Sequence, residues 1–220
     1  MCALKALATV LALTWAIPLL GAPDRWQALP GSLEMEPVSD SLRMNGTPML
    51  IRVFRSRQSP ETLLREIEAN WTLEPGHQPV HRTTIPNWTV LNQAIGERHR
   101  SFQVREQDGM TQGFVAVTSP RETREPTLVV RLPAQVQPMQ IIDSVDAGRE
   151  SQQVIAVSQR SIDVTAAAFG EVLKAQHWTT LMVTKQGNFV RLSANRGGEQ
   201  FDAVLSAQKR GALVMINTIR

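Results

Sequence analysis

The sequence predicts an α+β protein made of two similar tandem modules, each an antiparallel β-sheet packed against one α-helix. Strand-like alternation of apolar and polar residues runs through most of the chain after residue 40, and only one stretch in each half has apolar residues at helical spacing. A pattern also recurs: Phe102 and Phe114 are as far apart as Phe189 and Phe201. The strands that start at Phe114 and Phe201 both read Phe-x-Ala-Val-x-Ser.

The first 22 residues have the layout of a secretory signal peptide. Lys5 gives a basic start, residues 6–20 form an apolar run, and Gly21-Ala22 supplies small residues near a cleavage point. The run is shorter than the roughly 20 residues that a membrane-spanning helix needs, and Pro18 interrupts it. We therefore expect export to the bacterial periplasm or beyond. An uncleaved amino-terminal membrane anchor is the alternative, and only that alternative makes the membrane a partner.

Cysteine usage and charge narrow the class of protein that this sequence can encode. The single cysteine, Cys2, lies before the apolar run, so the exported chain is expected to rely on core burial without disulfides. The formal net charge is +3, and the signs alternate along the chain. A nucleic-acid partner is not expected, because that function needs a concentrated basic surface with interleaved aromatic residues.

The first module is predicted over residues 41–132, after a Pro- and Gly-rich tether at 23–40. Asn45-Gly46 between two strand-like runs is typical of a tight hairpin. Ser59-Pro60-Glu61 contains the residue types that begin a helix. The apolar face of that helix is formed by Leu63, Leu64, Ile67 and Trp71. A Pro-rich stretch at 75–86 breaks regular structure, and further strands are predicted at 88–95, 98–106, 111–118 and 127–132.

The second module is predicted over residues 140–220, after a linker at 133–139. Asp146-Ala-Gly148 forms its first turn, and Asp163 caps a helix whose apolar stripe is Ala168, Phe169, Val172 and Leu173. Strands follow from 178 onward. Both modules therefore have the order strand, strand, helix, and then three or four strands. One helix is about enough to cover the apolar face of one such sheet.

Residue types that carry catalysis or bind metals do not form a recognisable set. His77 and His81 are four residues apart, but Pro75, Pro79 and Pro86 prevent a helix there, and zinc needs three or four converging ligands. Ser206 and Lys209 fit Ser-x-x-Lys, but the order and the local structure are unlike those of enzymes that use this motif. We expect no enzymatic activity, no metal and no cofactor.

The Pro-rich insertion that ends at Trp88 is the predicted contact with a partner. It is where the two modules differ most in sequence, and loops on a rigid scaffold commonly carry function. A large ring at its end, if exposed, can act as a binding anchor. The candidate partner-binding residues are His77, His81, Asn87, Trp88, Arg98 and Arg100.

These features together favour an exported, non-enzymatic protein that binds or scaffolds other proteins. We expect an accessory subunit of a bacterial cell-envelope assembly, such as a secretion or surface-fibre apparatus, with envelope proteins as partners. The alternative is a periplasmic carrier that holds a lipid or a small apolar ligand between helix and sheet.

Overall fold

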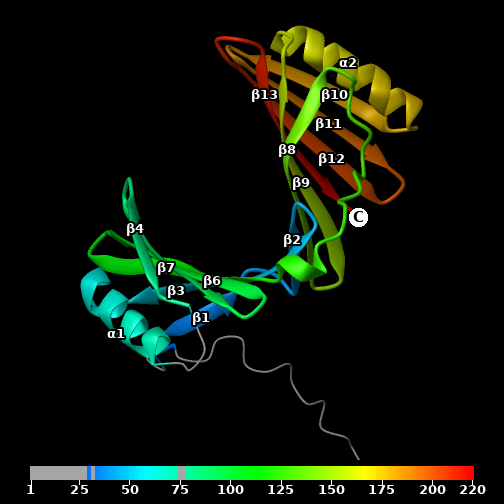
Figure 1. The fold of residues 1–220 in the computed structure, drawn as a ribbon. Coiled ribbons are helices and arrows are strands. Elements are labelled where there is room, and N and C mark those ends of the chain that lie inside the picture. The colour runs from blue at the N-terminus through cyan, green and yellow to red at the C-terminus, as the bar shows by residue number, and fades with distance from the viewer. Residues whose placement is uncertain (1–28, 31–32, 74–77) are drawn as a thin grey trace, which may run out of the picture.

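The computed structural model describes residues 29–30, 33–73 and 78–220 (Figure 1). It confirms an α+β protein with two modules, each formed by an antiparallel sheet and one α-helix. In the part of the chain that the structure describes, no helix is both long enough and apolar enough to cross a membrane.

Each module has the same succession of elements. The first contains β1 (Glu34–Pro37), β2 (Ser41–Met44), β3 (Thr47–Ser56), α1 (Pro60–Thr72), β4 (His81–Ile85), β5 (Trp88–Ile95), β6 (Arg98–Gln107) and β7 (Met110–Thr118). A 3-10 helix, η1 (Pro120–Glu122), follows. The second contains β8 (Val136–Asp146), β9 (Arg149–Ser158), α2 (Ile162–Ala175), β10 (Thr179–Gln186), β11 (Phe189–Arg196), β12 (Glu199–Ala207) and β13 (Ala212–Ile219).

Strand order repeats as well. The second module has the order β8-β9-β13-β12-β11-β10, and the first has β2-β3-β7-β6-β5-β4, with β1 pairing beside β2 on the same edge of β3. Strands β1 and β2 together therefore take the place of β8. The two modules share one topology, and every strand of the first has a counterpart in the second.

The sequence pattern that suggests the repeat lies on strands that are not counterparts. Phe114 begins its pattern in β7 and Phe201 in β12, whereas the counterpart of β12 is β6. The same shift separates Phe102 in β6 from Phe189 in β11. Every strand that covers a core on one face has the same alternation, so a match between two strands does not fix their order in the sheet.

Four segments differ from the sequence-based prediction. Residues 34–37, expected in the tether, form β1 and pair with β3. The Pro-rich stretch contains β4, whose five residues are all exposed and so lack the alternation by which a strand is recognised. Residues 127–132 form no strand, because the Gln152 side chain bonds the Val129 N–H (2.9 Å) and the Thr127 carbonyl (2.8 Å). Val130 is buried in the core of the second module, and β8 starts within the predicted linker.

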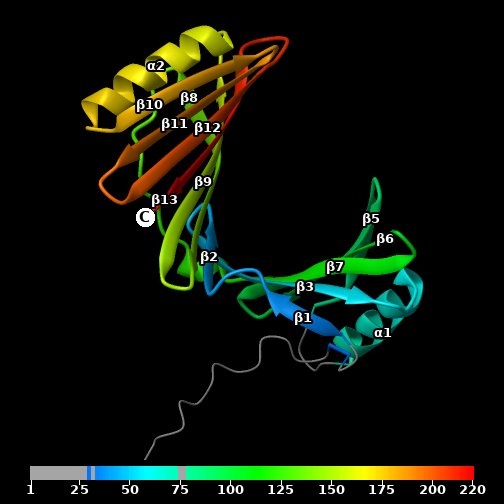
Figure 2. The same ribbon diagram turned by 180° about the vertical axis from the view of Figure 1, so that it is seen from behind.

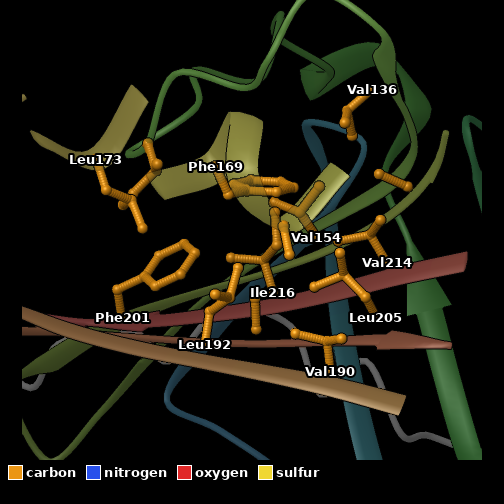
Figure 3. Close-up of a cluster of buried hydrophobic side chains, with 14 of the residues drawn as sticks. Val136, Val154, Phe169, Leu173, Val190, Leu192, Phe201, Leu205, Val214 and Ile216 are labelled. Carbon is orange, nitrogen blue, oxygen red and sulfur yellow. The ribbon is translucent and has the colours of Figure 1, made fainter. Parts of the chain in front are cut away.

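Each helix covers its own hydrophobic core. All four predicted core residues of α1 are buried, and they pack against a stacked pair, Phe54 and Phe102, with ring centroids 4.8 Å apart. In the second module Phe169 and Leu173 project from α2 onto the sheet, where they meet Phe201 and Leu192 (Figure 3). The N-cap of α2 is Ser161 instead of the predicted Asp163, which lies in the first turn.

The modules join through antiparallel pairing of their first strands. Leu42 of β2 lies opposite Ser144 of β8, and each is three residues before the turn that ends its strand. Equivalent residues thus face each other about a local two-fold axis perpendicular to the sheet. Side-chain hydrogen bonds reinforce the junction, among them those from the Ile141 N–H to Asn45 Oδ1 (2.8 Å) and from the Ala147 N–H to Asp40 Oδ2 (2.9 Å).

The shared sheet bends at this junction. Both views show α1 and α2 on the outer side of the bend, and the helix-free faces of the two modules on its inner side (Figures 1 and 2). We call the helix-free side of the whole sheet the inner face. Because side chains alternate along a strand, every second residue of each strand belongs to it.

Candidate binding surface on the inner face

The inner face of the first module carries a row of polar and aromatic residues across neighbouring strands. Register places Glu34, Arg55, Gln112 and Arg105 opposite one another from β1 to β6. The Arg105 guanidinium then lies over the Trp88 ring of β5, 4.7 Å from its centroid. The row has a carboxylate at one end and a stacked cation at the other.

These residues surround a groove of about 590 Å³ that opens on the inner face. Trp88 meets Phe114 edge-on in it, with ring centroids 5.7 Å apart and an interplanar angle of 63°. The Arg105 Nε is buried, and no described residue accepts a hydrogen bond from it. This first-module groove can therefore hold an apolar or aromatic side chain next to a guanidinium.

The inner face of the second module carries exposed apolar residues beside the Arg191–Asp202 ion pair. Val157, Val204, Met215 and Phe189 expose 36%, 42%, 45% and 54% of their surfaces. The strand register places them in two adjacent rows of laterally paired residues that run across the sheet. One row contains Val157 and Phe189, and the other contains Met215 and Val204. We call these four residues the second-module patch. A sheet face that only meets water usually carries polar residues there.

Sequence reasoning missed this patch, although a signal for it exists. Residues 154–157 read Val-Ile-Ala-Val and residues 213–216 read Leu-Val-Met-Ile, so both strands are apolar on both faces. A continuous apolar run of this length is typical of a strand covered on two sides. Here the helix covers one side, and the other lies open on the inner face.

The predicted partner-binding residues separate in the structure. Trp88 and the exposed His81 belong to the inner face, because they share its strand parity. Asn87 occupies the turn between β4 and β5 with a positive φ of 65°, which asparagine tolerates better than most residues. Arg98 starts β6 and is half-buried. His77 lies outside the described residues.

Arg100 points the other way, into the first core. It is 5% exposed, its guanidinium carbon lies 4.2 Å from the Trp71 ring centroid, and its Nε donates to Gln93 Oε1 at 2.9 Å. The Gln93 amide donates in turn to the carbonyl oxygens of Trp71 and Gln78. Arg100 thus links the end of α1 to the sheet.

Strand β4 is held to α1 by an exposed ion pair. Arg82 donates two hydrogen bonds to the Glu61 carboxylate, at 3.2 and 2.5 Å. These bonds lower the pKa of Glu61 below its ordinary value, and the positive charge of Arg82 adds to the effect. The same contact raises the pKa of Arg82.

We expect the Glu61–Arg82 pair to make part of the stability pH-dependent. A carboxyl group with a lower pKa in the folded chain stabilises the fold above its unfolded pKa, and this stabilisation is lost as the pH falls through the folded value. The urea midpoints of the wild type and Glu61→Gln should therefore differ at pH 7, and the difference should shrink as the pH falls below the ordinary range of a carboxyl pKa. Because both side chains are exposed, 1 M salt should also reduce the difference. A difference that stays constant from pH 7 to pH 3 would contradict this assignment.

The inner face offers aromatic, aliphatic and guanidinium groups over two modules. Where the structure describes the chain, no three His, Cys, Asp or Glu residues are grouped as a metal site would require. Ser206 accepts a hydrogen bond from the Gln208 amide at 3.0 Å, so its neighbour is a neutral group. No family model, no curated protein and no solved structure matches this chain.

Proposed function

We propose that this protein is an exported, non-enzymatic binding protein that holds another protein of the bacterial envelope on its inner face. In this proposal it is an accessory subunit of a secretion or surface-fibre apparatus. The observation that carries the proposal is the second-module patch, four large apolar side chains exposed together on a helix-free sheet. Contiguous exposed apolar surface of this kind marks interaction sites in soluble proteins.

The chemistry of the inner face is that of a protein interface. Interface centres are rich in aromatic residues, Met and Arg and poor in Lys, and the inner face presents Trp88, Phe189, Met215 and Arg105. Burying a large apolar side chain completely is worth about 1.5–3 kcal/mol. The half-exposed residues of the patch therefore supply about 1 kcal/mol each when a partner covers them.

The shape of the inner face favours a macromolecular partner over a small ligand. The residues lie on open sheet surfaces of two modules that a bend turns toward the same side (Figure 2). A stable protein interface buries about 800 Å² on each partner, and a surface that spans both sheets can supply such an area. The groove beside Trp88 then serves as a pocket for one anchoring side chain of the partner.

The proposal is tested with two matched substitutions. Val204→Glu puts a charge in the centre of the patch, whereas Val164→Glu puts the same charge on α2, where Val164 is 52% exposed on the outer side. Each tagged variant is produced in a bacterial envelope, crosslinked and purified with its bound proteins. We expect Val204→Glu to lose the partner that the wild type retains, and Val164→Glu to retain it, because a carboxylate in the centre of the patch loses its hydration when the partner covers it.

A second variant tests the first-module groove, and circular dichroism separates loss of binding from loss of folding. Trp88→Ala removes the ring that forms one wall of the first-module groove, and its effect on partner recovery should add to that of Val204→Glu. Far-UV circular dichroism shows whether each variant is folded. A specific partner retained by the folded Val204→Glu and Trp88→Ala variants, or a wild type that recovers no protein, would overturn the proposal.

A further inference from the structure

A second groove lies between α2 and β10, at the free end of the sheet. It has a volume of about 370 Å³, and its lining includes Ala166, Ala167 and Gly170 of α2 with Leu181 and Val183 of β10. Strand β10 is the last in its sheet and pairs only with β11 among the described strands. Val183 is 58% exposed on the helix side of this strand, and Met182 is 60% exposed on its inner face. An uncovered apolar edge strand is a ready site for pairing with another chain.

The first helix carries different side chains at the equivalent positions. Counted from the capping serines Ser59 and Ser161, Arg65 of α1 corresponds to Ala167 of α2, and Glu68 corresponds to Gly170. At these two positions the first helix carries long charged side chains, whereas the second carries only a methyl group and a hydrogen atom. A Cβ built on Gly170 would meet only Leu181, at an ordinary contact distance of 3.5 Å. The small residues at these two positions leave space along this flank of α2.

The side chains along this flank of α2 are complementary to themselves. Asp163, Ala167, Gly170 and Lys174 line the groove in that order, spaced symmetrically about a centre between Ala168 and Phe169. If a second α2 lies antiparallel to the first, each Ala167 faces a Gly170, and each Asp163 faces a Lys174. The exposed Ala167 leaves room for close approach in the middle, where Gly170 lies buried against Leu181. At each end the Asp163–Lys185 ion pair of one copy then meets the Lys174–Glu171 ion pair of the other, with opposite charges facing each other.

The middle of strand β10 lies beneath the symmetry centre of the α2 side chains. Lys185 binds Asp163 at 2.7 Å and Leu181 lies beside Gly170, so α2 and β10 run antiparallel and the centre of the stripe lies over the middle of β10. One two-fold axis can thus bring together both the helices and the free strand edges of two chains. The modules already meet in this way within the chain, where β2 pairs with β8 about equivalent residues.

From these contacts we propose that the protein forms a two-fold symmetric homodimer through its α2–β10 face. The occupant of the groove is the same face of a second copy, which makes the contact isologous and closed. This surface is separate from the inner face, so a dimer carries two inner faces and can hold two copies of a partner.

The oligomeric state of the full exported chain tests the proposal. Light scattering on a size-exclusion column and sedimentation equilibrium should give twice the chain mass for the wild type. Ala167→Arg, which copies the residue of the first helix, should raise the dissociation constant about a hundredfold or more, because a long cation then occupies the close contact. Ala175→Arg, on another exposed face of α2, is the matched control and should leave the dimer intact.

Charge reversal supplies a test that a folding defect cannot imitate. Lys174→Glu alone sets two carboxylates against each other at each end of the contact, and Asp163→Lys alone sets two ammonium groups there. Each variant should be largely monomeric, whereas an equimolar mixture should form a heterodimer because both end pairs are again opposite in sign. A monomeric wild type, an unchanged Ala167→Arg dimer, or a mixture that stays monomeric would overturn the proposal. So would an apolar small molecule found in the groove by native mass spectrometry.

Discussion

Replacing Gly46 with alanine is expected to destabilise the junction between the modules by about 3 kcal/mol. Gly46 has a positive φ of 78°, and a Cβ there would collide with the backbone carbonyl oxygen of Arg124. Relief of that collision moves the segment that crosses the junction. The movement breaks the hydrogen bond from the Arg124 N–H to the Gly46 carbonyl (3.3 Å) and strains the one from Arg43 Nη1 to the same oxygen (2.8 Å).

The second module provides the control for this prediction. Gly148 occupies the same position in the corresponding hairpin turn with a φ of 77°, and a Cβ added there would meet no atom within 4 Å. Gly148→Ala therefore bears only the conformational cost of a positive φ, about 1 kcal/mol. Urea unfolding measures both free energies, and limited proteolysis near residues 119–127 reports whether the crossing segment loosens. Equal effects of the two substitutions would show that Arg124 does not constrain the turn.

Local signals in the sequence were sufficient for the elements that local chemistry specifies. The hairpin at Asn45-Gly46, the start of α1 at Ser59-Pro60 and its four core residues are all confirmed. Each depends on contacts between residues close in the chain, such as the Ser59 hydroxyl that accepts from the Thr62 N–H. Such contacts are the same in any tertiary surrounding, so a single sequence reveals them.

Elements that depend on distant partners were not recoverable in the same way. Strand β1 exists because β3 offers it an edge, and residues 127–132 remain irregular because Gln152 takes their backbone hydrogen bonds. The order of the strands in the sheets is also set by pairing over long distances. Similar amphipathic patterns fit several places in a sheet, which is why the Phe-x-Ala-Val-x-Ser match was assigned to the wrong pair of strands.

The candidate surface was predictable only in part for the same reason. Trp88 stands out in the sequence as a large ring at the end of an insertion, but its neighbours Arg105 and Phe114 come from β6 and β7. The second-module patch draws on four strands, and no short motif joins them. A basic grouping such as Arg98 and Arg100 does not reveal which face of its strand it occupies, and register places both on the helix side of β6, away from the inner face.

That distinction leads to the second large effect. Arg100→Leu is expected to lower the free energy of unfolding by about 3 kcal/mol. The substitution removes a buried cation from the face of Trp71 and leaves Gln93 Oε1 without its donor inside the core. Leucine fills part of the volume, but it cannot satisfy that oxygen, and an unsatisfied buried acceptor costs about 1–3 kcal/mol by itself.

Arg98→Leu is the matched control, because Arg98 lies two residues earlier on the same strand and is only half-buried. It should change the unfolding free energy by less than about 0.5 kcal/mol. Urea unfolding monitored by tryptophan fluorescence measures both variants, and partner recovery from the envelope is measured in parallel. A stable Arg100→Leu variant that has lost its partner would contradict the structural role and return Arg100 to the binding surface. A destabilised variant that still recovers the partner when folded would mean that the buried guanidinium holds α1 on its sheet, while the inner face alone makes the contact.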